Sequence, residues 1–314
     1  MKESYDVIVV GAGPSGLTAA IQTSRLGLRT LVLETEKPGG RAAEAAIYEN
    51  FPGFPDGITG NELVARMLQQ VSKFGADLRD SEEVINIEVD GQMKKVTTKK
   101  STYNSHTLII ATGTQRKKLR VPGENELLGR GVSYCRACDG PFFKDLKVAV
   151  VGSTKEAARD SLFLAGVAKE VLWITDREEV ETDENLKREI TQRTNIRIVQ
   201  GTVAAILGEN KVEAVEITQL KPKRIVREKI DGVFIVLGWI PTTEIVRKAG
   251  VETDDRGCIS VDRWQRTNID GVFATGDCTC GGMQIVTAAG EGAMAATKAV
   301  AYVERKKEIK KTNS

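Results

Sequence analysis

The sequence of 314 residues is poor in several features on which whole classes of protein depend. It has one histidine, His106, whereas a zinc site needs about four His, Cys or carboxylate ligands, so a metal site is not expected. A formal net charge of +2 gives no strong field for nucleic acid or membranes. No apolar run approaches the roughly 18 residues of a membrane span, and the chain enters a strand directly, without a signal peptide. We therefore expect a soluble, cytoplasmic protein.

Five cysteines are an odd number for a disulfide framework, and four of them form two close groups. The groups are Cys135-Arg-Ala-Cys138 and Cys278-Thr-Cys280. In a cytoplasmic protein such spacing favours redox or metal chemistry, and the two groups together leave a four-thiolate zinc site open as the less favoured alternative. We expect Cys278 to be a small buried residue, because a thiol pair with Cys280 would be strained at this spacing.

Residues 5–34 carry a complete dinucleotide-binding fingerprint. The strand YDVIVV leads into Gly11-Ala-Gly13-Pro14-Ser15-Gly16, followed by a helix to about residue 26 and a second strand that ends at Glu34. The three glycines allow a tight turn, the approach of the backbone to phosphate and close packing of helix on strand. The helix N-terminus attracts a pyrophosphate, and Glu34 can accept hydrogen bonds from a ribose hydroxyl.

Two later strands complete the pattern of one particular cofactor. LIIATGT (108–114) and GVFATGDC (271–278) are apolar strands that end in glycine turns, and a predicted helix follows the second. Together with the fingerprint they resemble the FAD site of flavoproteins that have two dinucleotide-binding domains. Residues 147–181 repeat the strand–glycine–helix–strand order, which indicates an internal duplication.

These patterns predict an α/β protein with two dinucleotide-binding, Rossmann-like domains of the three-layer ββα type. The FAD-binding domain is expected to be discontinuous, comprising 1–117 and 245–314. Residues 118–244 form the inserted domain, which resembles an NAD(P)H domain and carries the Cys-x-x-Cys motif.

The segment GVSYCRACDGPFF (131–143) is expected to carry the chemistry. Two cysteines separated by two residues can form a small disulfide and exchange it with a disulfide of another molecule. Asp139 follows Cys138 directly and can move the thiol proton. The alternative of two small core residues is less favoured, because Gly140-Pro141 marks a turn just after the pair.

Six segments resemble those of the low-molecular-weight thioredoxin reductases in their order and spacing, and together they extend over nearly the whole chain. They are the fingerprint, ENFPGF (49–54), the ATG turn, CRACDG, GVFATGDC and TAAGEGAMAA. The resemblance implies a homodimeric flavoprotein in which Cys138 faces the flavin, Cys135 attacks the disulfide of thioredoxin or a glutaredoxin-like protein, and Asp139 is the acid–base group. It implies that FAD is bound by Gly11, Gly13, Pro14, Ser15, Gly16, Glu34, Gly40, Arg41, Asn50, Thr112, Gly113, Asp277, Gln284 and Ile285.

The second dinucleotide-binding segment departs from the NADPH-dependent members of that family. They have G-x-G-x-x-A in the loop, then a His-Arg-Arg cluster with another Arg four residues later. Here Thr154 replaces the second glycine, and Thr175-Asp176-Arg177 replaces the cluster. Loss of two bidentate arginine contacts would cost on the order of 3–6 kcal/mol, at about 1.5–3 kcal/mol each. The remaining changes add negative charge: Glu178, Glu179 and, in place of the later arginine, Glu181.

We therefore expect the second segment to keep its fold without its nucleotide, with NADH beside Asp176 or NADPH as less favoured alternatives. The helix region KEAARD (155–160) resembles family branches that use reduced ferredoxin, and WITDREEVE (173–181) resembles branches that use a reduced deazaflavin coenzyme. The sequence leaves the choice between these donors open. The competing functions are an FAD-dependent dithiol oxidase that uses oxygen and a non-catalytic redox sensor.

Overall fold

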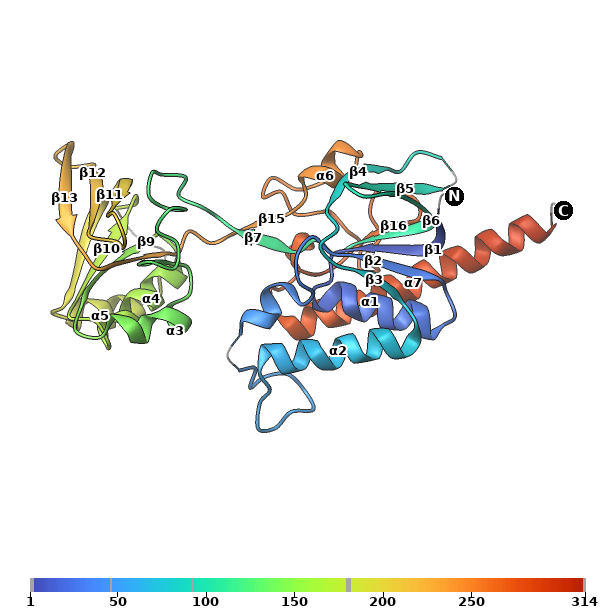
Figure 1. The fold of residues 1–314 in the computed structure, drawn as a ribbon, viewed down its shortest axis with the longest axis horizontal. Coiled ribbons are helices and arrows are strands. Elements are labelled where there is room, and N and C mark those ends of the chain that lie inside the picture. Colours follow the sequence, from blue (N-terminus) through green and yellow to red (C-terminus); the bar gives the residue numbers. More distant parts are fainter. Residues whose placement is uncertain (1–2, 46, 92, 179–181, 313–314) are drawn as a thin grey trace. The chain divides into compact units, whose positions relative to one another are not determined.

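The structure, a computed structural model, describes residues 3–45, 47–91, 93–178 and 182–312 (Figure 1). The chain divides into two compact units, one formed by 1–115 with 240–314 and the other by 116–239. Glu179 and Glu181 of the sequence analysis lie outside the described residues. Within the described part of the chain, no helix is long and apolar enough to cross a membrane.

A seven-stranded sheet forms the centre of the first unit (Figure 1). Its order is β3-β2-β1-β6-β5-β4, and β16 pairs with β6. The strands β3, β2, β1, β6 and β16 are parallel, whereas β4 and β5 pair antiparallel. The bounds are β1 Glu3–Val10, β2 Thr30–Leu33, β3 Asp77–Arg79, β4 Val84–Glu88, β5 Lys94–Thr98, β6 Thr102–Ile110 and β16 Val272–Ala274.

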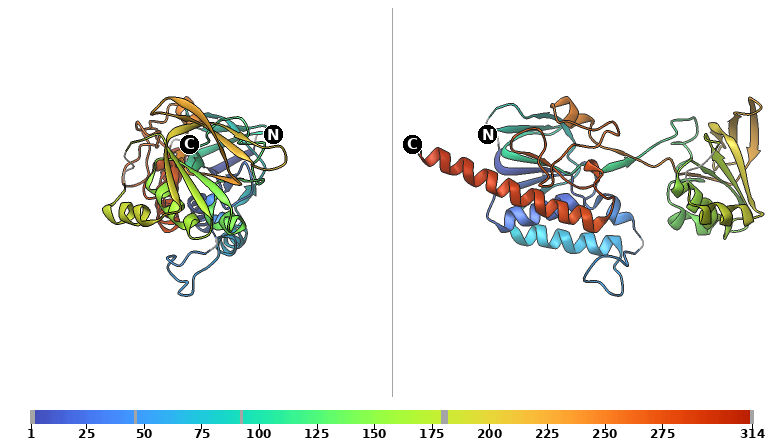
Figure 2. Two further views of the ribbon diagram at one scale, coloured as in Figure 1. Left: turned by 90° about the vertical axis from the view of Figure 1, so that its left-hand side faces the viewer. Right: turned by 180° about the vertical axis from the view of Figure 1, so that it is seen from behind.

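Three long helices of this unit pack together, and Figure 1 and the right-hand view of Figure 2 show them on one face of the sheet. They are α1 (Pro14–Arg25), α2 (Gly60–Phe74) and α7 (Ile285–Thr312). Small residues let α1 and α7 approach closely, since a Cβ on Gly292 would lie 2.2 Å from the Ser15 carbonyl oxygen. The short elements are η1 (Gly40–Glu44), α6 (Glu244–Lys248) and η3 (Gly276–Thr279).

The second unit has its own seven-stranded sheet, in the order β13-β12-β11-β10-β9-β14-β8. Its strands are β8 Val132–Ser133, β9 Lys147–Val151, β10 Glu170–Thr175, β11 Ile196–Leu207, β12 Ala214–Gln219, β13 Arg224–Lys229 and β14 Gly232–Ile235. Its helices are α3 Arg136–Asp139, η2 Gly140–Phe143, α4 Lys155–Ala165 and α5 Glu184–Gln192. The segments at the boundary of the units, β7 (Thr114–Arg116) and β15 (Trp239–Pro241), pair with each other.

The predicted internal repeat is present: β9, Gly152, α4 and β10 follow the same order as β1, Gly11, α1 and β2. The parallel pairing of β1 with β2 recurs between β9 and β10. The predicted fold class, α/β with Rossmann-like units, is therefore confirmed.

Trp173 ties the second unit's glycine turn to its sheet. Its ring is 2% exposed, and its Nε1–H donates to the buried Gly152 carbonyl oxygen over 2.8 Å. Trp173→Phe removes this donor and leaves the carbonyl unsatisfied, so we expect a loss of about 1–3 kcal/mol in the free energy of unfolding. Urea unfolding followed by circular dichroism measures it. Trp264→Phe, at a partly exposed position of the first unit, is the control and should shift stability by less than about 1 kcal/mol; equal losses would contradict the prediction.

Candidate functional site

The turn between β1 and α1 contains three glycines with different roles. The fold requires two of them, and the third leaves an open space beside the backbone. Gly11 has φ +103°, and a Cβ there would lie 2.3 Å from the Ala111 carbonyl oxygen. A Cβ on Gly16 would lie 1.9 Å from the Gly11 carbonyl oxygen. In contrast, a Cβ on Gly13 would meet no described atom within 4 Å. The fold therefore requires Gly11 and Gly16, whereas Gly13 keeps open the space beside the helix N-terminus.

The N-terminus of α1 is not capped by a side chain. Gly13 is the N-cap residue and offers no side-chain acceptor, and Pro14 begins the helix. The first backbone N–H groups of a helix carry a partial positive charge and bind anions when no side chain satisfies them. An open space beside an uncapped helix start fits the pyrophosphate of a dinucleotide.

Glu34 lies directly after β2, where its carboxylate joins two neighbouring turns. Oε2 accepts the Ala12 N–H over 2.7 Å, and Oε1 accepts the Glu36 N–H over 3.0 Å. The acid is therefore held next to the turn that Gly11 opens, as the fingerprint predicts for a group that binds a ribose.

Arg41 and Asp277, which are 236 positions apart in sequence, form an ion pair in the first unit. Nη1 of Arg41 lies 2.9 Å from Oδ2 of Asp277 and also donates to the Thr114 hydroxyl over 2.9 Å. Burial raises the pKa of the Asp277 carboxyl, and Arg41 opposes that shift. Gly40, next to Arg41, lies beside Gly13, because its Cβ would be 3.7 Å from the Gly13 Cα.

The remaining predicted cofactor residues are joined by fewer contacts. The Asn50 amide lies 3.5 Å from Oε1 of Gln284, and the Thr112 hydroxyl donates to the Thr242 carbonyl oxygen over 2.7 Å. Ile285 begins α7 and is buried in the helical core. All of these contacts lie within the first unit, from the α1 turn to the start of α7.

Glu291 is a residue of this region that sequence reasoning missed. Its Oε2 accepts the Gly276 N–H over 2.8 Å, which fixes the turn that presents Asp277. Burial raises the pKa of its carboxyl. It lies inside the predicted last helix, and no pattern in the sequence distinguishes it from a solvent-facing glutamate.

The corresponding turn of the second unit is built differently. Gly152 has φ +151°, and a Cβ there would lie 2.1 Å from the Val236 carbonyl oxygen, so this glycine is required by the fold as Gly11 is. Thr154 is the N-cap of α4, and its hydroxyl accepts the Ala157 N–H over 3.2 Å. A side chain of the protein therefore occupies an N–H group that a phosphate would otherwise bind.

A cavity of about 690 Å³ opens at this turn and is lined by Gly152, Ser153, Thr154, Asp176 and Arg177 among others. The Ser153 hydroxyl bonds to the Asp176 carboxylate and, over 2.8 Å, to the Thr175 hydroxyl. These bonds place a carboxylate beside the turn, at the end of β10. A carboxylate at this position repels a phosphate, whereas the cations Lys117, Lys155 and Arg177 line the same cavity.

Cys135 and Cys138 form a disulfide at the helical turn α3. Cys135 is the N-cap residue, and its Sγ accepts the Cys138 N–H over 3.1 Å. Cys138 is exposed and Cys135 half-buried. Asp139 ends α3 directly after Cys138, and Phe142 in the following turn is 78% exposed. A disulfide with an exposed sulfur-bearing residue and an apolar neighbour is suited to exchange with another protein.

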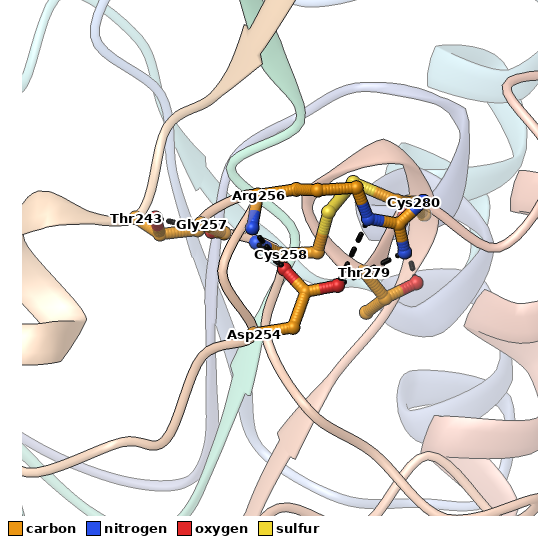
Figure 3. Close-up of a disulfide and its surroundings, with 8 residues drawn as sticks. Thr243, Asp254, Arg256, Gly257, Cys258, Thr279 and Cys280 are labelled. Atoms are coloured by element: carbon orange, nitrogen blue, oxygen red, sulfur yellow. Dashed lines mark hydrogen bonds and ion pairs between the residues drawn. A yellow bond between two sulfur atoms is a disulfide. The ribbon is translucent and has the colours of Figure 1, made fainter.

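Cys278 and Cys280 do not bond to each other, in agreement with the strain expected at their spacing. Cys280 forms a disulfide with Cys258, a residue 22 positions earlier that the sequence analysis did not use (Figure 3). Cys278 is free and fully buried, as predicted, and burial raises the pKa of its thiol to about 11. The two disulfides hold four cysteines, and among the described residues no cluster of three or more His, Cys, Asp or Glu side chains could hold a metal ion.

Comparison with known proteins agrees with this geometry. Residues 5–292 match the family model of the pyridine nucleotide-disulphide oxidoreductases. The thioredoxin reductase of Listeria innocua is 40% identical over 310 residues, which cover 97% of this chain and 95% of the relative.

Solved structures give the same relationship. The structure of Lactococcus lactis thioredoxin reductase in the FR conformation matches with a TM-score of 0.80 at 35% identity, over 96% of this chain and 99% of that one. A ferredoxin-flavin thioredoxin reductase from Clostridium acetobutylicum matches with a TM-score of 0.54 at 30% identity, over 97% and 100% of the two chains.

The raised pKa of Cys278 makes its reactivity testable. With a pKa of about 11, on the order of one thiol in a thousand is ionised at pH 8, and burial also shields the sulfur. We expect iodoacetamide at pH 8 to leave the native, oxidised protein unmodified and to label one cysteine after unfolding in urea. Mass spectrometry of the intact protein counts the labels. Labelling of the native protein as fast as the unfolded one would contradict the burial of Cys278.

Proposed function

The chain belongs to the pyridine nucleotide-disulphide oxidoreductase family, and on that premise we propose that it is an FAD-dependent thioredoxin-disulfide reductase whose electron donor is not NADPH. It is an oxidoreductase that acts on a sulfur group. The observation that carries the choice of donor is the contrast between the two glycine turns. One has an open, uncapped helix start at Gly13, and the other has a helix start capped by the protein's own Thr154.

FAD fits the first unit. The α1 N-terminus and Gly13 would bind its pyrophosphate, Glu34 a ribose, and Arg41 with Asp277 the phosphate and the adjoining ribityl chain. When bound, FAD supplies a two-electron carrier between the donor and the Cys135–Cys138 disulfide. The other residues that we propose for FAD binding are Gly11, Pro14, Ser15, Gly16, Gly40, Asn50, Thr112, Gly113, Gln284 and Ile285.

Exchange with the protein substrate is assigned to Cys135. An electron pair breaks the Cys135–Cys138 bond, and the Cys138 N–H, which already points at Sγ of Cys135, stabilises the Cys135 thiolate. That thiolate attacks one sulfur of the thioredoxin disulfide and forms a mixed disulfide. In this first step the other thioredoxin sulfur leaves as a thiolate and takes up a proton. Cys138 then attacks Sγ of Cys135 and releases the thioredoxin sulfur bonded to it, while Asp139 transfers a proton to that leaving thiolate. The products are the restored Cys135–Cys138 disulfide and a dithiol protein.

Thioredoxin, or a similar dithiol protein, is supported as the substrate by the relatives and by the surface beside the disulfide. The curated relatives are thioredoxin reductases that match over nearly the full chain. Phe142 offers an exposed apolar side chain four residues after Cys138. Such a side chain contacts a partner without the desolvation cost of a charged one.

The donor is proposed to be reduced ferredoxin or a reduced deazaflavin coenzyme. Thr154 occupies an N–H group that a pyrophosphate would otherwise bind, and Asp176 stands where NADPH-dependent members of the family have a cation. A ferredoxin-flavin enzyme is among the structures that match this chain. We further propose a cytoplasmic homodimer, in keeping with the family resemblance.

One prediction of the proposed function concerns flavin binding. Because a Cβ on Gly13 meets no protein atom, Gly13→Val should leave the fold intact and fill the space reserved for the pyrophosphate. We expect FAD to bind at least about tenfold more weakly, measured by flavin fluorescence on titration of the flavin-free protein. The flavin-free variant and wild type should share one urea midpoint. Thr154→Val, at the corresponding position of the second unit, is the matched control and should leave FAD affinity unchanged.

Another prediction of the proposed function concerns the electron donor. Anaerobic mixing of the flavin-loaded protein with reduced ferredoxin or reduced deazaflavin coenzyme should bleach the flavin and produce thioredoxin thiols. NADPH should bind at least about a hundredfold more weakly than it binds an NADPH-dependent relative, the factor that corresponds to about 3 kcal/mol of lost contacts, and should bleach the flavin correspondingly less at low concentration. Absorbance at the flavin band and a thiol reagent follow the two events.

Controls separate the steps of this reaction. Cys135→Ser and Cys138→Ser should each retain bleaching by the donor and lose thiol production, because the electrons then have no disulfide to enter. Efficient turnover with NADPH would contradict the proposed donor and leave the disulfide chemistry intact. Hydrogen peroxide formed from a small dithiol in air, without reduction of thioredoxin, would instead support a dithiol oxidase.

A further inference from the structure

A second disulfide, Cys258–Cys280, joins two separate segments of the first unit (Figure 3). Cys258 follows the turn 254–257, and Cys280 begins the segment that leads to α7. The bridge therefore connects a turn to the loop 279–284, which lies between two groups of proposed FAD residues: Asp277 before it, and Gln284 with Ile285 at its end. It is not part of the exchange chemistry assigned to Cys135 and Cys138.

The cysteine at one end of the bridge is firmly anchored. Cys258 is 2% exposed, and its backbone N–H donates to the Asp254 carboxylate over 2.9 Å. Asp254 is in turn paired with Arg256 at 2.9 Å, and the Thr243 hydroxyl donates to the Gly257 carbonyl oxygen over 2.8 Å (Figure 3). The turn around Cys258 is thus held by contacts that do not need the disulfide.

The loop at the other end has fewer supports. Cys280 is half-buried, and residues 281–284 are exposed. Cys280 and Met283 have φ +58° and +54°, a left-handed conformation that is unfavourable for side chains other than glycine, and Gly281 and Gly282 lie between them. A covalent bond at Cys280 holds a strained and exposed loop against a rigid turn. Apart from that bond, the loop has the Cys280 N–H bond to the Asp277 carbonyl oxygen (3.1 Å) and the contact of Gln284 with Asn50 (3.5 Å).

We propose that Cys258–Cys280 is a second exchangeable disulfide, which a dithiol protein of the thioredoxin class reduces, and that its opening loosens the loop 279–284 and weakens flavin binding. The proposal rests on the proposed function, because the reductant is the dithiol product of that reaction. Its accumulation would act back on the enzyme that makes it.

The exchange is balanced. A thiolate of the dithiol protein attacks Sγ of Cys280, the partly exposed end, to form a mixed disulfide, and Cys258 leaves as a thiolate that takes up a proton. The partner's second thiol then attacks the mixed disulfide and releases Cys280 as a thiol. The partner is oxidised to its disulfide, and the two electrons and two protons that it loses appear in the Cys258 and Cys280 thiols.

The test uses the full chain, loaded with FAD, in which Cys135→Ser and Cys138→Ser remove the first disulfide. Reduced thioredoxin is added, the reaction is stopped, and thiols are counted by alkylation under denaturing conditions with mass spectrometry. The count should rise from one, Cys278, to three, Cys278 with Cys258 and Cys280. Because this variant cannot turn over, the result is independent of the donor and of reductase activity.

The second readout is the loop itself. If the binding-competent loop is populated about one time in ten after opening, the dissociation constant of FAD rises about tenfold, as measured by the fluorescence of released flavin. Cleavage by thermolysin beside Met283 should accelerate in parallel. Cys280→Ser and Cys258→Ser in the same background should show the loosened behaviour without reductant and no further response to it.

Three thiols together with weaker FAD binding and faster cleavage support the proposal. A count that stays at one in the presence of reduced thioredoxin overturns it. A count of three with unchanged FAD affinity and cleavage also overturns it, since the bridge would then not control the loop. Failure of the wild-type chain to reduce thioredoxin with any donor would count against the proposed function and is measured separately.

Discussion

In both units the glycine after the first strand lies so close to the end of the neighbouring strand that no side chain fits between them. Both folds depend on this steric constraint. At Gly11 and at Gly152 an added Cβ would come within about 2 Å of a carbonyl oxygen of the adjacent strand end, Ala111 in one unit and Val236 in the other. Only glycine allows the chain to leave the first strand and enter the helix there. This is why the second unit keeps its first glycine while the rest of its loop differs, and why it keeps the strand–helix–strand order.

The two units differ two residues after that glycine, at a position where the fold does not require a glycine. Gly13 faces open space, so the fold does not require its small size, and Thr154 at the corresponding position is compatible with the fold. Thr154 even supports its helix by capping the Ala157 N–H. A position that is free of structural constraint is thus an uncapped helix start in one unit and a helix cap in the other. The contrast makes the first unit the proposed carrier of the flavin and the second the carrier of the disulfide alone.

Local signals made the main elements predictable from sequence. The turn from Gly11 to Gly16 lies between an apolar strand and an amphipathic helix, and such patterns depend on neighbours within a few residues. Thr154 and Asp176 could be recognised as departures from the loop and the His-Arg-Arg cluster of the NADPH-dependent family members that the chain resembles. Contacts between distant segments carried no such signal: Arg41 with Asp277, Glu291 with the Gly276 N–H, and Cys258 with Cys280.

The sequence by itself determined the class of fold, the intact and altered glycine loops and the Cys135–Cys138 pair, because each depends on short-range spacing. The tertiary structure decided which distant groups meet. It paired Cys280 with Cys258 instead of its near neighbour Cys278, and it buried Cys278 with a raised pKa. Cysteines bond according to their distance and direction in space, and these are set by packing between segments that are far apart in the chain.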